Sequence, residues 1–250
     1  TITNDSGFGG SVLPRIVDNG LGVNLTISQA PGINTANSQI SLSGGNYVTG
    51  DNFTRTLNVT NGVFVNLGST ASLNRNVTVN VTNGGTLGYL REGTQIIAGL
   101  NGDASGILDG GGAADYSTTI FAGTGTYGFG GVINKSTSIV MAGSPAAVQS
   151  LWGANTFHNI SGAGQTFVES GNLNLDFSHA GAPQNDILYN AQTPANLIVG
   201  GGTLSLTGSA SQPNVQHFGQ ISVGNGATGG GRVVMTTNGQ DLLISTGNIV

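Results

Sequence analysis

Few side chains in this 250-residue sequence could act in catalysis or bind a metal ion. There are 11 Asp and Glu residues, three His and no Cys. The densest carboxylate group is Asp103, Asp109 and Asp115, evenly spaced in a glycine-rich stretch. Such carboxylates could bind calcium, which takes about six to eight oxygen ligands. However, the stretch matches neither an EF-hand loop nor the nonapeptide of calcium β-rolls. We therefore interpret these residues as turn aspartates that bind their own backbone, and we expect no metal site and no cofactor.

Arrangements of nucleophile, base and acid are not recognisable in the sequence. A glycosidase needs two carboxyl groups that face each other across the scissile bond, but the central acidic residues occur singly. The histidines His158, His179 and His217 are far apart and show no pairing pattern. Ser6 lacks the G-x-S-x-G turn of a nucleophilic serine. We therefore predict no catalytic residues, and a protein that is not an enzyme.

Aromatic residues concentrate between positions 116 and 157. Aromatic rings on a β face can stack on sugars, so Tyr116, Tyr127 and Trp152 are candidates for contact with a surface glycan. The alternative is that the aromatic residues of this segment pack in the core or cap a stack of strands.

The charge and the length of the apolar runs exclude two classes of partner. Only 7% of the residues are charged and the net charge is −5, where a soluble domain usually carries about 25% charged residues. Six basic residues cannot form the positive surface that nucleic acid requires. No apolar run approaches the roughly 20 residues that span a bilayer, so we expect no membrane insertion by this segment.

The elements that would position these residues are short strands. Val and Leu alternate with polar residues in short bursts, each closed by a turn that contains Gly, Asn or Asp; this period is typical of β-strands. The bursts are Leu57/Val59, Val63/Val65/Leu67, Val77/Val79/Val81, Leu173/Leu175/Phe177, Leu204/Leu206 and Ile221/Val223. No stretch forms a convincing amphipathic helix, because glycine, Thr, Val and Asn are too frequent.

A repeated tetrapeptide indicates stacked coils. The sequence VTNG at 59–62 recurs at 81–84. This spacing of 22 residues favours an all-β right-handed parallel β-helix, or β-solenoid, with coils of roughly 20–25 residues. Gly and Asn would take left-handed backbone conformations at its corners. The alternative is a Greek-key β-sandwich. We predict one domain over residues 1–250. Because the sequence begins with Thr rather than Met and its last residues stop within a strand-like segment, we interpret the chain as a fragment or processed part of a longer one.

Several phrases resemble the autotransporter-associated β-strand repeats of large bacterial surface and secreted proteins. They are GTQIIAGLNGD at 93–103, TIFAGTGTYGFGGVI at 119–133, FVESGNLNLDFS at 167–178, AGAPQNDILY at 180–189 and GGGTLSLTG at 200–208. The resemblance covers about residues 57–250. The resemblance implies a right-handed parallel β-helix displayed outside a bacterial cell. It implies no catalytic residues in this chain, because the repeat itself has none.

These observations together predict a non-enzymatic extracellular structural or adhesive protein, a β-solenoid rod in a bacterial surface, filament or matrix assembly. Unless they are capped, unpaired strands at the ends of such a rod favour association with copies of the same protein or continuation of the chain. The alternative is a carbohydrate-binding or carbohydrate-cleaving β-helix protein. A third function, binding to ice or a mineral surface, requires Thr-x-Thr pairs in register one coil apart. The sequence has Thr54-Arg55-Thr56 and Thr124-Gly125-Thr126 but no regular series.

Overall fold

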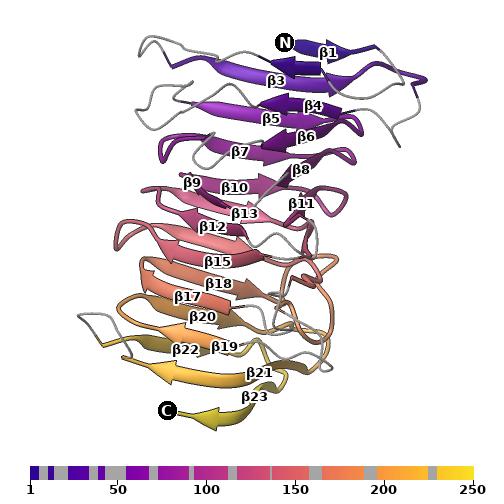
Figure 1. The fold of residues 1–250 in the computed structure, drawn as a ribbon. Helices are drawn as coiled ribbons and strands as arrows, with labels where there is room; N and C mark the ends of the chain where they lie inside the picture. Colours follow the sequence, from indigo (N-terminus) through magenta and orange to yellow (C-terminus); the bar gives the residue numbers. More distant parts are fainter. Residues whose placement is uncertain are drawn as a thin grey trace.

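The protein is a parallel β-solenoid in which strands succeed one another along a single axis from the N-terminus to the C-terminus (Figure 1). The computed structural model describes residues 1–5, 11–13, 22–33, 39–42, 55–67, 73–89, 93–111, 117–135, 137–157, 165–188, 196–224 and 230–250. All regular elements in these ranges are strands, and no helix in them has the length and apolar character needed to cross a bilayer. The described strands pair in parallel, which confirms the predicted solenoid and excludes the Greek-key sandwich.

Three sheets run along the axis and form the sides of the coil. Sheet A contains ten strands: β1 (Ile2–Asn4), β3 (Asn24–Gln29), β5 (Thr56–Thr60), β7 (Thr78–Val81), β10 (Gly99–Gly102), β13 (Thr126–Phe129), β16 (Val148–Leu151), β18 (Asn172–Asp176), β20 (Thr203–Thr207) and β22 (Arg232–Thr236). Sheet B contains six: β2 (Ser11–Leu13), β4 (Gln39–Leu42), β6 (Phe64–Leu67), β8 (Thr86–Tyr89), β11 (Ile107–Asp109) and β14 (Val132–Asn134). Sheet C contains seven: β9 (Gly93–Ile97), β12 (Ser117–Phe121), β15 (Thr137–Ala142), β17 (Gln165–Ser170), β19 (Asn196–Val199), β21 (Asn214–Val223) and β23 (Leu242–Ile249).

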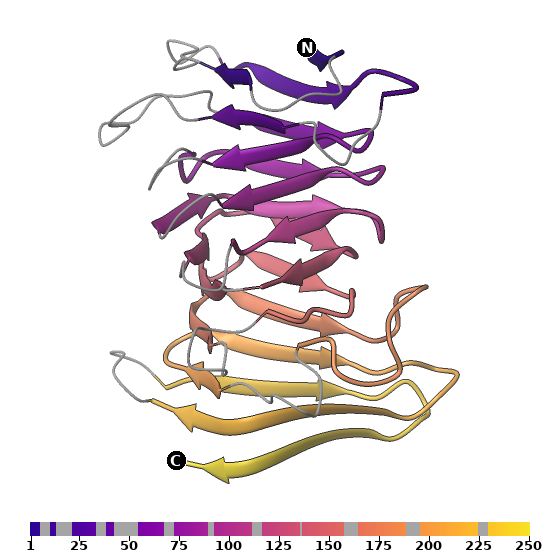
Figure 2. The same cartoon turned by 45° about the vertical axis from the view of Figure 1, so that its right-hand side comes forward.

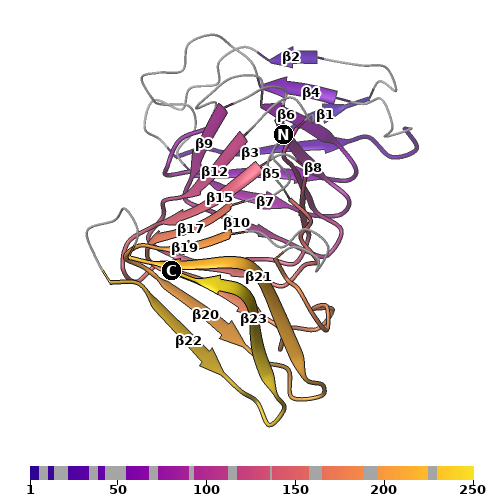
Figure 3. The same ribbon diagram turned by 60° about the horizontal axis from the view of Figure 1, so that its bottom comes forward.

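The shape of the coil changes along the axis. In its middle, one coil visits the three sheets in turn, as in β7, β8 and β9, before β10 returns to sheet A (Figure 2). Past β14, the side that sheet B occupied continues in the described residues as the parallel bridges Asn155–Leu188 and Asn185–Val215. Near the C-terminus the long strands β21 and β23 bend across two sides, and the coil becomes flatter (Figure 3).

The alternating bursts form the core. Leu57, Val59, Val79 and Val81 are fully buried, while the residues between them on the same strands are half-buried. Removing such a side chain from water contributes roughly 1.5–3 kcal/mol, so each coil is stabilised by the coils above and below it. The predicted inward position of Val223 is wrong: this residue is 45% exposed.

Asn-Gly pairs form the corners where sheet A ends. Asn61 and Asn83 have φ values of 57° and 49°, and each is followed by a glycine with a φ of 74°. Positive φ is strained for most residues but accessible to Asn and Gly, which confirms the predicted left-handed corners. The recurring VTNG sequence thus marks the same turn in two successive coils.

The coil length is less regular than the sequence return suggests. The strand partners Asn58 and Asn80 are separated by 22 positions in the sequence. Ser117 and Thr137 are separated by 20 positions, and Thr26 pairs with Asn58 across 32 positions. The strands keep their register in each case, so the extra residues lie in the connections. The predicted coil length therefore holds for some coils and is too short for others, such as the one between Thr26 and Asn58.

Candidate functional site

The candidate glycan-contact residues belong to two successive rungs of sheet A. Tyr116 lies outside the described residues, Tyr127 is in β13, and Trp152 directly follows β16. Tyr127 and Trp152 are both half-buried. The Tyr127 ring occupies the space above Gly99, where a Cβ atom would lie 2.1 Å from Cγ of the tyrosine. The ring therefore covers a glycine of the preceding rung.

Trp152 contacts protein on both sides of its ring. A Cβ atom on Gly128 or Gly130 would lie 2.6 Å or 2.0 Å from the indole, so the ring lies across these two glycines. The imidazole of His179 stacks on it, with ring centroids 4.0 Å apart and an interplanar angle of 17°. A sugar that stacked on Trp152 would have to displace His179. Among the described candidates, the glycan-contact prediction therefore rests mainly on Tyr127.

Backbone pairing between β10 and β13 is interrupted near Tyr127, and the side chain of Gln149 supplies hydrogen bonds to Leu100 in place of it. The strands β10 and β13 are paired at one position, Gly102 with Phe129. Gln149, in the next strand β16, is fully buried. Its Oε1 accepts a hydrogen bond from the backbone N–H of Leu100 at 2.9 Å, and its Nε2 donates to the C=O of Leu100 at 2.8 Å. The side-chain amide thus takes the place of a peptide group of a neighbouring strand.

Asp103 and Asp109, the two central aspartates that the structure describes, accept hydrogen bonds from backbone N–H groups of their own turns, as predicted. Asp103 accepts hydrogen bonds from the backbone N–H of Ser105 at 2.8 Å and of Asn83, one coil earlier, at 3.0 Å. Burial raises the pKa of Asp103, but these hydrogen bonds and the one from the Ser105 hydroxyl outweigh it and hold the pKa below its usual value.

Asp109 is buried at the end of β11 and forms an ion pair in addition to its turn hydrogen bond. It accepts a hydrogen bond from the backbone N–H of Gly111 at 3.0 Å, and its Oδ2 lies 2.6 Å from Nζ of Lys135. Its turn role is therefore confirmed, with an additional ion pair to the next coil. Asp115, the third candidate calcium ligand, lies outside the described residues. In the described ranges, no group of three or more His, Cys, Asp or Glu side chains could hold a metal ion.

Two histidines have partners that the sequence did not indicate. Besides His179 on Trp152, the Nδ1 atom of His217 lies 2.9 Å and 3.0 Å from the two carboxylate oxygens of Asp186. The same carboxylate accepts the backbone N–H of His217 at 2.8 Å. Sequence spacing does not indicate the contact between Asp186 and His217, because the two residues are far apart in the sequence but only one coil apart in space. His158 and Ser6 lie outside the described residues.

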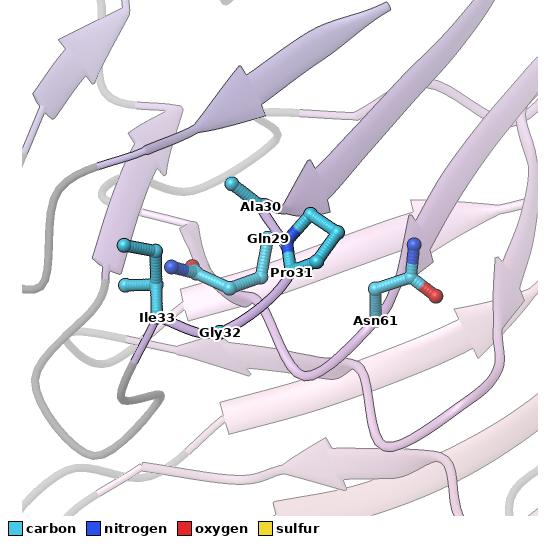
Figure 4. A pocket seen from close by; sticks show the side chains of 6 residues that line it. All are labelled: Gln29, Ala30, Pro31, Gly32, Ile33 and Asn61. Carbon is cyan, nitrogen blue, oxygen red and sulfur yellow. The ribbon is translucent and has the colours of Figure 1, made fainter.

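A pocket of about 430 Å³ lies beside the loop that follows β3. Figure 4 shows Asn61, from the corner of the next rung, opposite this loop. None of the lining side chains is charged or nucleophilic: Gln29, Ala30, Pro31, Gly32, Ile33 and Asn61. The described pocket therefore offers shape and amide groups, but no acid, base or nucleophile.

The last rung of the described structure exposes apolar side chains. Val233 and Met235 of β22 are 38% and 41% exposed, and Ile249 of β23 is 72% exposed. Their partners on the preceding rung are buried: Leu204 pairs with Val233, Leu206 with Met235, and Ile221 with Ile249. We call Val233, Met235 and Ile249, with the outer edges of β22 and β23, the terminal face.

Comparison with known proteins returned no matching family model, no matching curated protein and no matching solved structure.

Proposed function

We propose that this chain is a non-enzymatic structural and adhesive protein of a bacterial surface or extracellular matrix, and that its solenoid associates with copies of itself through the terminal face. The extracellular bacterial setting is supported by the resemblance of residues 57–250 to autotransporter-associated repeats. A rod role is supported by the continuous stack of parallel rungs, which ties successive coils together by main-chain hydrogen bonds along the axis.

The observation that carries the self-association is the register of the terminal face. Val233, Met235 and Ile249 are in register with Leu204, Leu206 and Ile221, which are buried because another rung covers them. A further rung of the same kind would bury the three exposed side chains. The outer edges of β22 and β23 also present backbone N–H and C=O groups that a parallel strand can pair. In solutions of the 250-residue chain, a second copy can supply both the strand edge and the apolar side chains.

Sedimentation velocity of the 250-residue chain over a range of concentrations tests this association. We expect concentration-dependent assemblies for the wild type and their loss in Met235→Lys, because the ammonium group would have to be buried in a new interface. Thr236→Lys is the matched control, since Thr236 pairs with the outward-facing Thr207 on the same strands, and we expect it to assemble as the wild type does. A wild-type chain that stays monomeric, or equal assembly by both variants, would contradict the proposal.

Extracellular display has a separate test. Protease added to intact source cells should degrade the protein while cytoplasmic proteins stay intact. Protection of the protein in intact cells would contradict display at the surface, whatever its state of association.

A further inference from the structure

The outer face of four neighbouring rungs carries a regular array of uncharged polar side chains. It comprises the outward residues of β3, β5, β7 and β10, which run side by side in Figure 1. We call this array the Thr/Asn face, and its three columns along the solenoid axis are Asn24, Thr56 and Thr78; Thr26, Asn58, Asn80 and Asn101; and Thr60 and Thr82. Ser28, the strand partner of Thr60, is buried and does not belong to the face.

The register makes this array periodic in two directions. Strand pairing places Thr56 beside Thr78 and Asn58 beside Asn80, at the rung spacing of about 4.8 Å. Along each strand, outward residues alternate with buried ones, so adjacent columns are about 6.7 Å apart. The repeated unit is Thr-x-Asn-x-Thr, present at 56–60 and again at 78–82.

Hydrogen bonds between rungs fix the central column. Nδ2 of Asn58 donates to Oγ1 of Thr26 at 3.1 Å, Nδ2 of Asn80 to Oδ1 of Asn58 at 2.8 Å, and Nδ2 of Asn101 to Oδ1 of Asn80 at 3.1 Å. The amides are therefore held in one orientation before any ligand arrives. Binding then costs little side-chain entropy, which favours a rigid partner with the same periodicity.

We propose that the Thr/Asn face binds the surface of ice. Ice presents an uncharged, rigid lattice of oxygen atoms that donate and accept hydrogen bonds and repeat in two directions. The strands of this face contain no charged residue in the ranges 24–29, 56–60, 78–81 and 99–102. A neutral face complements a neutral lattice, because a charged side chain would hold its own hydration water and disturb the ordered layer.

The same features argue against two other periodic solids. A mineral surface attracts charged side chains, and the strands of this face have none in the ranges just given. A crystalline polysaccharide is commonly bound through aromatic stacking, but the nearest aromatic residue of the candidate set, Tyr127, covers Gly99 at the edge of the array and so ends it. Hydroxyl and amide groups in register, without charge or aromatic rings, fit ice best.

Uptake of the 250-residue chain into a slowly growing ice hemisphere tests the proposal. We expect the wild type to be enriched in the ice fraction relative to an inert protein. Thr78→Tyr should lose this enrichment, because a bulky ring would project from the array beside Thr56 and Asn80 and hold a flat ice surface away from them. Thr118→Tyr is the matched control: Thr118 is a half-buried residue of β12 on sheet C, and this variant should be taken up as the wild type is. Thr78→Lys is a second variant, with a flexible side chain that the fold accommodates more easily, and it should also lose enrichment.

Folding of each variant is checked by circular dichroism and the urea midpoint. An unenriched wild type would overturn the proposal, and so would equal uptake of the Thr78 and Thr118 variants. Retention of the wild type on insoluble cellulose or chitin, without enrichment in ice, would overturn it in favour of a polysaccharide surface. The outcome is independent of self-association, because Thr78 and the terminal face lie on different rungs.

Discussion

Replacing Gln149 by Met tests whether a side-chain amide completes the broken ladder between β10 and β13. Methionine has a similar length but cannot bind the N–H and C=O of Leu100. Each buried backbone group left without a partner costs about 1–3 kcal/mol, and the more apolar side chain offsets part of this loss by about 1–2 kcal/mol. We therefore expect Gln149→Met to lower the free energy of unfolding by about 2–3 kcal/mol, the middle of the range that these two effects give.

The assay combines urea unfolding, followed by circular dichroism, with amide hydrogen exchange of Leu100. Unfolding should shift to lower urea, and the Leu100 amide should exchange at least about 30-fold faster, which corresponds to a loss of about 2 kcal/mol. The matched control is Gln220→Met, because the Gln220 side chain is partly exposed on β21 and a surface change of this kind alters stability by about 0.5 kcal/mol or less. If Gln149→Met leaves both the stability and the Leu100 exchange unchanged, the assigned role of the amide is refuted.

Three further changes test local features of the coil. Asn83→Ala should destabilise the protein by about 1–2 kcal/mol because its φ is positive, whereas Asn83→Gly should cost less; equal urea midpoints for the two variants would contradict the left-handed corner. The lowered pKa of Asp103 stabilises the folded state above its usual pKa and ceases to do so as pH falls through the folded-state pKa, so the stability advantage over Asp103→Asn should shrink between about pH 5 and pH 2; a constant difference in unfolding free energy would exclude this linkage. Gly130→Ala should displace the Trp152 ring, and tryptophan fluorescence should shift toward a more exposed spectrum; an unchanged spectrum would show that the ring does not lie on Gly130.

The sequence was sufficient to predict the strands and the corners, because both depend on local chemistry. Alternation of Leu57 and Val59 with polar residues reports which side of a strand faces the core. The Asn-Gly pairs at 61–62 and 83–84 report a backbone conformation that few other residues adopt. Neither inference depends on which rungs of the solenoid are adjacent.

Contacts between rungs were not predictable, because their register depends on connections of unequal length. Coils of different lengths place Asp186 beside His217 and Gln149 beside Leu100, at separations that no fixed repeat indicates. The Thr/Asn face was missed for a related reason. A Thr-x-Thr pattern does not describe this face, because its strands repeat Thr-x-Asn-x-Thr. The recurrence of VTNG, which contains Thr60 and Thr82, was the signal that could have located it.

The most direct test of the parallel coil is a cysteine pair at positions 56 and 78 in this otherwise cysteine-free chain. Thr56 and Thr78 are outward-facing partners on adjacent rungs, at about the 4.8 Å rung spacing, which is within the range of Cα separations that a disulfide bridges. The solenoid predicts that Thr56→Cys/Thr78→Cys forms an intramolecular disulfide under mild oxidation, as measured by intact mass and thiol titration. It also predicts that Thr56→Cys/Thr82→Cys, in which the second cysteine is displaced along the strand direction, does not. Free thiols in the first variant, or equally efficient closure in both, would contradict the stacked register from which the terminal face and the Thr/Asn face are built.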